Sequence, residues 1–330
     1  MHTPVLLKEV IEYLNPQPGQ NFIDATVGDG GHARAILAKV APGGKVLGID
    51  WDETALKGLR LDTGSIAGSS TGAWEPEPPQ DPAGLRRGGV SGVDRSGIEP
   101  RSFQSGPAES NLVLREGNFA DLAELAAEAN FKNVAGVLFD LGFRTFHLEE
   151  SGRGFSFSRN EPLDMRYSTE TGLTALEIIN TWPQPELERV FKEWGEERNF
   201  RRIAESIIRA RAKGKIATTG QLVEIIGRAA GVKTLARVFQ ALRIAVNGEL
   251  ENIERGLAGA WQILEKDGRL AVISFHSLED RLVKNFFNSR KKNGFGRVLT
   301  AKPVTASVEE IKANPRGRSA KLRVIIKIRN

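Results

Sequence analysis

The 330-residue sequence predicts an α/β protein with a mostly parallel sheet and a second, all-helical unit inserted into it. Three observations support this class. Short apolar runs that carry an acid lie at 21–26, 45–50 and 134–140, with helical patterns between them. From 143 to 231 the alternation lapses and helical patterns dominate. At 268–277 another apolar run resumes the sheet pattern.

The first of these runs leads directly into a glycine-rich turn. The pattern predicts a buried strand at 21–26, a turn at 28–31 and a helix at 32–40. Glycines in such a turn let the backbone approach a ligand and adopt conformations that side chains forbid. Asp24 lies inside the strand, where a carboxylate is costly to bury without a partner.

Two further acids are predicted at strand ends. The strand at 45–49 ends at Asp50, and the strand at 134–140 ends at Asp140. In open α/β sheets, ligands bind beyond the carboxyl ends of the strands, and an acid after the second strand holds ribose hydroxyls. We therefore expect Asp24, Asp50 and Asp140 to converge on one crevice.

The turn itself narrows the class of ligand. A pyrophosphate-binding turn follows the pattern G-x-G-x-x-G, whereas residues 28–32 read Gly-Asp-Gly-Gly-His. Asp29 would repel a pyrophosphate, but it suits a cationic ligand with a free α-amino group, such as S-adenosylmethionine. An ordinary tight turn with no ligand is the alternative.

The composition excludes several kinds of chemistry. The chain has no cysteine, so disulfides, thiolate metal sites and cysteine nucleophiles are absent. It has only four histidines and no H-E-x-x-H pattern, so we expect no catalytic metal. The net charge of +5 favours a polyanionic partner only weakly, because it is ordinary for this length. No apolar run reaches membrane-spanning length, and residues 1–4 lack a charged-then-apolar signal pattern, which predicts a cytoplasmic protein without membrane contact.

The remaining elements complete the expected organisation. Residues 1–15 predict a lead-in helix, and 61–110 are rich in Gly, Pro and Ser, which predicts a flexible surface insertion. A strand begins at 111 and a helix follows at 121–129. Apolar residues spaced by three or four from 239 to 264 predict a long helical stretch that packs in the core, and 297–300 with 321–328 predict a closing β pair.

The helical unit carries the densest basic surface. Helices are predicted at 175–180, 185–194, 199–212 and 219–230. On and just before the third helix, Arg198, Arg202 and Arg209 fall on one stripe. Arg211, Lys213 and Lys215 follow along the chain and extend this basic surface. Contact with nucleic-acid phosphates and an ordinary solvated helix face are both compatible with this stripe.

Together these motifs resemble the RsmH (MraW) methyltransferase family, which methylates the exocyclic 4-amino group of a cytidine in bacterial small-subunit ribosomal RNA. The matching segments are His2-Thr-Pro-Val5, Asp24-Ala-Thr-Val-Gly-Asp-Gly-Gly-His32, Gly48-Ile-Asp-Trp-Asp52, Asp140-Leu-Gly142, Arg153-Gly-Phe-Ser-Phe157, Leu163-Asp-Met-Arg166, Gly195-Glu-Glu-Arg-Asn-Phe-Arg201, Phe239-Gln-Ala-Leu-Arg-Ile244, Ser274-Phe-His-Ser-Leu-Glu-Asp280 and Asn314-Pro-Arg316. The resemblance covers nearly the whole chain except 61–110.

The resemblance implies a Rossmann-like class I methyltransferase domain at 1–142 and 232–330, with a helical substrate-binding domain at 143–231. It implies S-adenosylmethionine as the cofactor and small-subunit ribosomal RNA near the decoding centre, within the assembled subunit, as the partner; the oligomeric state stays open. The implied cofactor contacts are Gly30, Gly31, His32, Asp50, Phe119, Asp140 and His147. His147 departs from the family, which usually has glutamine there in a loop similar to Ser-Ser-Pro-Gln.

A cytosine amino group is a weak nucleophile, so its methylation needs in-line placement and an acceptor that polarises the N–H. Asp140, Asp164 and His276 are the candidate acceptors, and a structural hydrogen bond is the alternative for Asp164 and His276. The amino-methyltransferase signature Asn/Asp-Pro-Pro-Tyr is absent. Two other classes stay open: a non-catalytic RNA-binding protein, supported only by the altered loop 144–147, and a nicotinamide-dependent oxidoreductase, disfavoured by Asp29.

Overall fold

The computed structural model describes residues 4–52, 55–59, 111–142, 148, 150–169, 172–227 and 231–329. All the structural statements below refer to these residues. Among them, no helix combines the length and the apolar character that crossing a bilayer requires. The segment 61–110 and the loop 143–147 lie outside the described residues, so the expectations placed on them stay predictions.

The described strands form one seven-stranded sheet in the order β3-β2-β1-β4-β5-β7-β6. The first five strands in this order pair in parallel, whereas β7 pairs antiparallel with both β5 and β6. This confirms the expected closing β pair. The strands are β1 (Asn21–Asp24), β2 (Val46–Asp50), β3 (Leu112–Glu116), β4 (Val134–Asp140), β5 (Leu264–Ser274), β6 (Gly296–Val298) and β7 (Lys321–Lys327).

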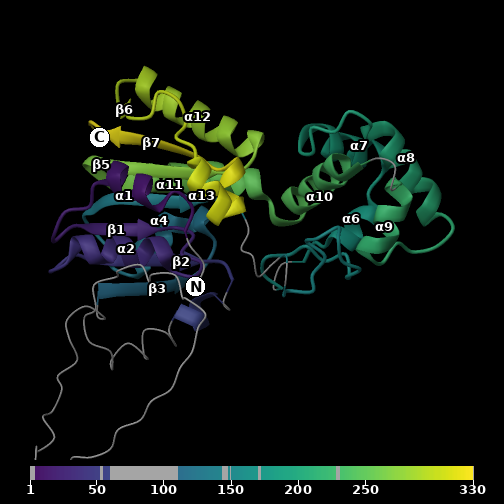
Figure 1. Cartoon of the computed structure of the whole chain (residues 1–330), viewed down its shortest axis with the longest axis horizontal. Coiled ribbons are helices and arrows are strands. Elements are labelled where there is room, and N and C mark those ends of the chain that lie inside the picture. The colour runs from purple at the N-terminus through teal and green to yellow at the C-terminus, as the bar shows by residue number, and fades with distance from the viewer. Residues whose placement is uncertain are drawn as a thin grey trace, which may run out of the picture.

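Helices cover both faces of the sheet (Figure 1). One face packs against α4 (Leu122–Glu128), α11 (Glu249–Ile263) and α12 (Ser277–Lys292) through a core that includes Trp261 and Phe287. The opposite face packs against α1 (Leu7–Leu14) and α2 (Gly31–Val40). Burying apolar strands between two helical layers is the main source of stability in this kind of fold.

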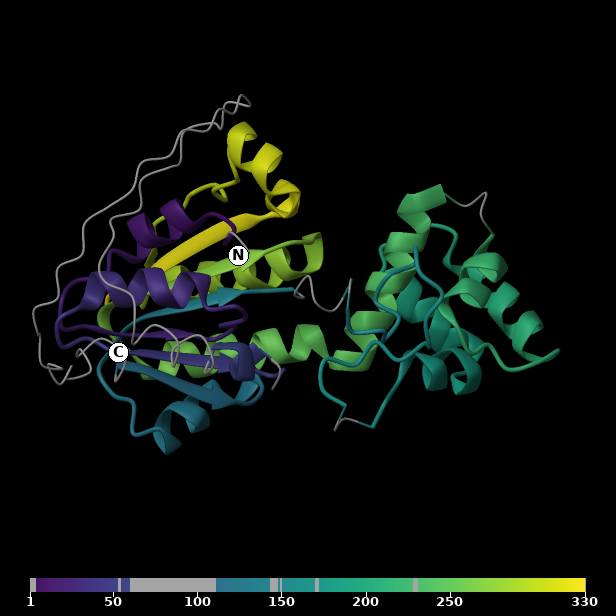
Figure 2. The same cartoon turned by 60° about the horizontal axis from the view of Figure 1, so that its bottom comes forward.

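A second unit, all helical, is inserted between β4 and β5 and lies beside the sheet in both views (Figures 1 and 2). Its own hydrophobic core unites all five helices with the segment around Phe155 and Met165. The helices are α6 (Ala175–Thr181), α7 (Gln184–Glu193), α8 (Phe200–Arg211), α9 (Thr219–Ile226) and α10 (Gly231–Asn247). The expected α/β class with an inserted helical unit is confirmed.

The long helical stretch expected at 239–264 consists of two helices, α10 and α11. Gly248 separates them with a φ of +60°, a left-handed conformation that glycine adopts without strain. Buried residues of α10, among them Val238 and Leu242, belong to the helical core and not to the sheet. We infer that the helical unit extends to Asn247, beyond the boundary near 231 that the sequence suggested.

Candidate active site

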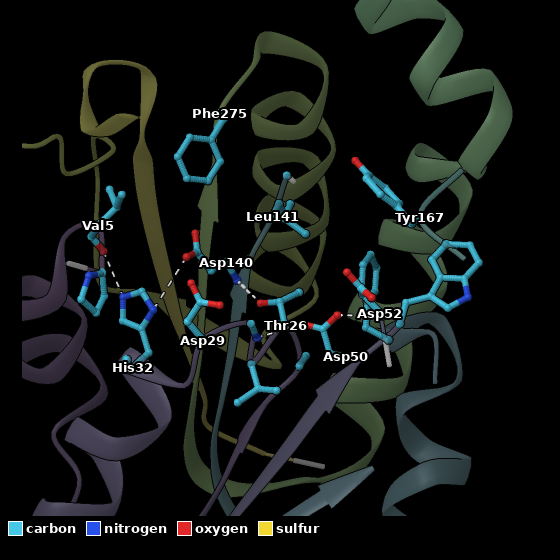
Figure 3. A pocket seen from close by; sticks show the side chains of 18 of the residues that line it. Val5, Thr26, Asp29, His32, Asp50, Asp52, Asp140, Leu141, Tyr167 and Phe275 are labelled. Carbon is cyan, nitrogen blue, oxygen red and sulfur yellow. Dashed lines mark hydrogen bonds and ion pairs between the residues drawn. The ribbon is translucent and has the colours of Figure 1, made fainter. Parts of the chain in front are cut away.

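A cleft opens at the carboxyl ends of β1, β2 and β4, where the chain order of the strands reverses around β1 (Figure 3). Ligands of open α/β folds bind at such a switch point. The cleft is lined by Pro4, Val5, Ala25, Thr26, Val27, Gly28, Asp29, Gly31, His32, Asp50, Trp51, Asp52, Phe119, Asp140, Leu141, Gly142, Tyr167, Phe275 and Arg316.

Asp50 lies at the tip of β2 and is held by two backbone donors. The N–H of Gly28 donates to Oδ2 at 2.8 Å, and the N–H of Asp52 donates to Oδ1 at 2.9 Å. A carboxylate oxygen can accept more than one hydrogen bond, so these two backbone donors do not by themselves exhaust the acceptor capacity of the carboxylate. This arrangement suits the two hydroxyls of a ribose. Phe119, which also lines the cleft, packs edge-on against Phe139 with ring centroids 5.6 Å apart.

The glycines of the turn have different roles. Gly28 lines the cleft with a φ of +49°. Gly30 has a φ of +78° and is not among the residues that line the cleft; a Cβ there would lie 2.3 Å from a methyl carbon of Leu59. Gly31 lines the cleft, and a Cβ there would lie 2.3 Å from the Pro4 ring. Of the two glycines expected to contact the cofactor, Gly31 borders the cleft, whereas the contact expected of Gly30 stays a prediction.

Asp140 closes the centre of the cleft at the end of β4. Its backbone N–H donates to the Thr26 hydroxyl at 2.7 Å, and its side chain is 25% exposed. In the described part of the chain, its Oδ1 atom has no hydrogen-bond partner. Burial raises the pKa of Asp140 to about 7, although the Arg316 guanidinium opposes that rise. Asp140 can therefore bind or release a proton near neutral pH.

His32 lies beside Asp140 at the start of α2 (Figure 3). Its Nε2 atom is 3.0 Å from the Val5 carbonyl oxygen, and its Nδ1 atom is 3.7 Å from Oδ2 of Asp140. Burial lowers the pKa of His32, which keeps the ring neutral. The imidazole thus ties the N-terminal segment to the centre of the cleft.

Asp24 is close to the cleft but does not line it. Its side chain is buried, and one oxygen accepts the Thr26 N–H at 3.3 Å while the other has no partner among the described residues. Burial raises the pKa of Asp24 to about 7. Of the three strand acids expected to converge, Asp50 and Asp140 face the cleft and Asp24 lies beneath it.

The helical unit contributes one wall of the cleft through Tyr167. The Tyr167 ring stacks on Phe155 at 5.6 Å, its hydroxyl donates to Oε1 of Glu249 at 3.1 Å, and its backbone N–H donates to Asn247. Glu249 in turn forms a buried ion pair with Arg243 at 2.8 Å. These contacts fix Tyr167 beside the cleft, opposite Phe275 (Figure 3).

Two of the three candidate acceptors do not line the cleft. Asp164 pairs with Arg166 through hydrogen bonds of 2.8 and 2.7 Å. Burial favours a higher pKa, but these bonds hold the pKa of Asp164 below its ordinary value. His276 caps α12: its ring accepts the N–H of Glu279 at 3.4 Å. Both residues therefore fit structural hydrogen bonds, which leaves Asp140. His147 lies outside the described residues.

Glu249, His276 and Glu279 place their ligand atoms within 4.8 Å of one another, a spacing that could hold a metal ion. Arg243 lies against the same group, paired with Glu249. A buried guanidinium already supplies the positive charge that these carboxylates require, so the residues fit an ion-pair network better than a metal.

The basic stripe lies on the exposed side of α8. Arg198, Arg202 and Arg209 are exposed, whereas Ile203 and Ile207 are buried in the helical core, as their spacing predicts. Arg209 lies 3.6 Å from Glu205. Arg211, by contrast, donates to the carbonyl groups of Ile179 and Trp182 and therefore has a structural role.

Comparison with known proteins identifies the family. The sequence model of the MraW methylase family matches residues 1–61 and 94–328. The chain belongs to this family. It is 40% identical to ribosomal RNA small subunit methyltransferase H of Syntrophotalea carbinolica, covering 98% of this chain and 97% of that protein. The proteins of the same name from Dictyoglomus thermophilum and Symbiobacterium thermophilum are 41% and 40% identical, over 98% and 99% of this chain and 96% of each of those proteins.

The family match also refines the extent of the Gly/Pro/Ser-rich insertion. The segment without a counterpart is 62–93, and the match resumes at residue 94. Part of the segment 61–110 therefore follows the MraW pattern, which the composition alone did not indicate.

The cleft of this MraW methylase fits S-adenosylmethionine. Asp50 presents oxygens suited to the ribose, and Phe119 offers an aromatic edge for the adenine. Asp29 and Asp140 supply negative charge where a cationic ligand would extend past the glycine turn. The unpartnered Oδ1 of Asp140 is a buried acceptor that a ligand donor can satisfy.

Several cleft residues were not expected from the sequence. Tyr167, Phe275 and Arg316 come from three segments that are distant along the chain, and tertiary packing brings them to the cleft. Arg316 and Phe275 do lie within segments that resemble the family, which is the signal that could have identified them.

Proposed function

We propose that the protein transfers a methyl group from S-adenosylmethionine to the exocyclic 4-amino group of a cytidine in small-subunit ribosomal RNA. Membership of the MraW family and full-length similarity to small-subunit methyltransferases support this function. The structural observation that carries it is Asp140, a partly exposed carboxyl with a pKa of about 7 at the centre of a cleft suited to the cofactor.

When bound, S-adenosylmethionine supplies an electrophilic methyl group on its sulfonium. The protein's part is to position the amino group and to remove its proton. The lone pair of a cytosine amino group is delocalised into the ring, so an acceptor that polarises the N–H raises its reactivity. Asp140 is the acceptor that we propose, with its partly exposed carboxylate receiving the hydrogen bond.

The target base has to leave its stack to reach Asp140, which is the usual requirement for chemistry on a base. Tyr167 and Phe275 flank the cleft above Asp140 and offer aromatic surfaces beside an extruded base (Figure 3). We assign the RNA backbone to the basic stripe Arg198, Arg202 and Arg209 on the helical unit. The assembled subunit is the substrate we expect.

The decisive experiment is transfer of labelled methyl groups to purified small ribosomal subunits, followed by nucleoside analysis. Free ribosomal RNA and DNA serve as alternative substrates, and Asp50→Ala as the variant with impaired cofactor binding. We expect N4-methylcytidine in the subunit fraction and its loss in the variant. Cofactor binding without transfer to any of these substrates would favour the non-catalytic RNA-binding alternative.

A further inference from the structure

Arg316 is the only arginine or lysine among the residues that line the cleft, as far as the structure describes them. The other charged residues in the lining are four aspartates: Asp29, Asp50, Asp52 and Asp140. His32 is the remaining basic residue in the lining, and its burial lowers its pKa, which keeps the ring neutral. A ligand that carries an anionic group can therefore meet a formal positive side-chain charge only at Arg316.

The backbone of Arg316 is fixed by its surroundings. It lies in the short helix η5 (Pro315–Ser319), and its N–H donates to the side chain of the buried Asn314 at 3.3 Å. At the next residue, Gly317, a Cβ would lie 3.1 Å from the Ala306 methyl group. A fixed backbone reduces the conformational entropy that the segment loses when its side chain binds a ligand.

Arg316 belongs to the His32 side of the cleft. A Cβ at Gly317 would lie 3.8 Å from a methyl carbon of Val5, whose carbonyl contacts His32. The preceding helix α13 (Val308–Ala313) is joined to the same N-terminal segment, because the Leu6 N–H donates to Oε1 of Glu310 at 2.6 Å. Arg316 also acts electrostatically on Asp140.

This side of the cleft is where the amino-acid tail of the cofactor would lie if Asp50 holds the ribose. The tail is a zwitterion with an ammonium and a carboxylate. Asp29 points into this part of the cleft beside His32 and Asp140 and suits the ammonium (Figure 3). The carboxylate needs a cation, and the planar guanidinium of arginine matches a carboxylate with two parallel hydrogen bonds.

We propose that Arg316 binds the α-carboxylate of the cofactor and thereby selects S-adenosylmethionine over related sulfonium compounds that lack this group. The proposal rests on the cofactor part of the proposed function and is independent of the RNA substrate. The segment that contains Arg316 resembles the family in sequence, but that resemblance implied no role for it; the proposal gives Arg316 a role in cofactor specificity.

The test measures binding by calorimetry without RNA, using three probes. S-adenosylmethionine carries the whole tail, decarboxylated S-adenosylmethionine lacks only the carboxylate, and 5′-methylthioadenosine lacks the amino-acid portion. The variants are Arg316→Gln, Arg316→Lys and the matched control Arg318→Gln. Arg318 lies in the same short helix but is exposed and does not line the cleft.

We expect Arg316→Gln to weaken binding of S-adenosylmethionine by about 10- to 100-fold, the range for a hydrogen bond between charged groups. Binding of 5′-methylthioadenosine should not change, which also shows that the variant is folded. The preference of the wild type for S-adenosylmethionine over its decarboxylated form should disappear. Arg316→Lys should retain part of this preference, and Arg318→Gln all of it.

Three results would overturn the proposal. Equal loss for all three probes would assign Arg316 to the architecture of the cleft or to neutralising Asp140. Unchanged binding of all three, with weaker binding of small ribosomal subunits, would assign it to an RNA phosphate. Unchanged binding of all three probes and of small ribosomal subunits would show that Arg316 binds none of these ligands. If subunits are not methylated but the carboxylate preference depends on Arg316, the proposed RNA substrate fails and this inference stands.

Discussion

The Nδ1 atom of His32 lies 3.7 Å from Oδ2 of Asp140. Because the Val5 carbonyl can only accept a hydrogen bond, the neutral imidazole carries its proton on Nε2, as assigned from this contact. Nδ1 then presents a lone pair toward Asp140. Two acceptors that face each other favour a proton between them, which agrees in direction with the raised pKa of Asp140.

The first prediction concerns the pH dependence of methyl transfer. An acceptor works in its deprotonated form, and the pKa of Asp140 is raised to about 7, so activity is lost as the pH falls below this value. We expect kcat/KM to rise about tenfold per pH unit below pH 7 and to level off above it. Asp140→Asn should lower kcat by at least about 100-fold. The same acidic limb in the variant would assign the titration to another group.

A second prediction concerns stability and Asp24. Its pKa is 3.8 as a model group and about 7 in the fold, so the folded state binds the proton more tightly. The carboxyl therefore lowers stability progressively as the pH rises from about 4 to 7. Asp24→Asn removes this loss and should raise the free energy of unfolding at pH 8 by up to about 4 kcal/mol, and by much less at pH 4.

Thermal unfolding of Asp24→Asn and wild type at several pH values checks this prediction. Glu124→Gln on α4 is the control. Glu124 is exposed, so this substitution removes a carboxylate whose ionisation carries no burial cost. A stability gain that does not depend on pH would mean that the carboxylate of Asp24 is not destabilising.

The strand-end acids could be predicted because their placement follows from local pattern and general topology. A strand, a glycine turn and a helix set the positions of Asp50 and Asp140 without knowledge of distant contacts. The same pattern could not distinguish Asp24, which is buried beneath the cleft, because it shows which strand carries an acid but not how deeply the strand is covered.

The two candidate acceptors that do not line the cleft have local contacts that explain them. Asp164 has its partner two residues away, at Arg166, and His276 stands three residues before Glu279 at the start of a helix. The first spacing is typical of a local ion pair, and the second is typical of a capping box at a helix start. Tyr167 and Arg316 could not be placed, because each reaches the cleft through packing between segments that are far apart in sequence.

A third prediction concerns the buried pair Arg243–Glu249 at the junction between α10 and α11. Glu249→Gln leaves the buried guanidinium without its main counter-charge, which typically costs about 3–5 kcal/mol. Glu279 also attracts the Arg243 guanidinium electrostatically, so we expect the loss of stability to lie at the lower end of this range. Chemical denaturation measures it. The double variant Arg243→Met/Glu249→Leu should lose less than the single one; an equal or larger loss would show that apolar residues cannot replace the pair.

The last prediction concerns the basic stripe. Each phosphate that a cationic side chain neutralises releases counterions, so the affinity for nucleic acid falls with salt in proportion to the number of such contacts. If Arg198, Arg202 and Arg209 each contact a phosphate, replacing all three by glutamine should raise KM for small subunits. It should also reduce the slope of log K against log salt by about 2–3. Cofactor affinity should not change, because none of the three lines the cleft.

A matched control separates a specific contact from general charge. Lys291, Lys292 and Lys302 are exposed on the sheet unit and are absent from the cleft lining. Replacing them by glutamine removes the same net charge from a different surface. If both triple variants weaken binding equally, the stripe contributes only to the overall field of the protein. A loss confined to the α8 variant identifies the helical unit as the part that binds the RNA backbone, which would hold the target nucleotide in register with Asp140.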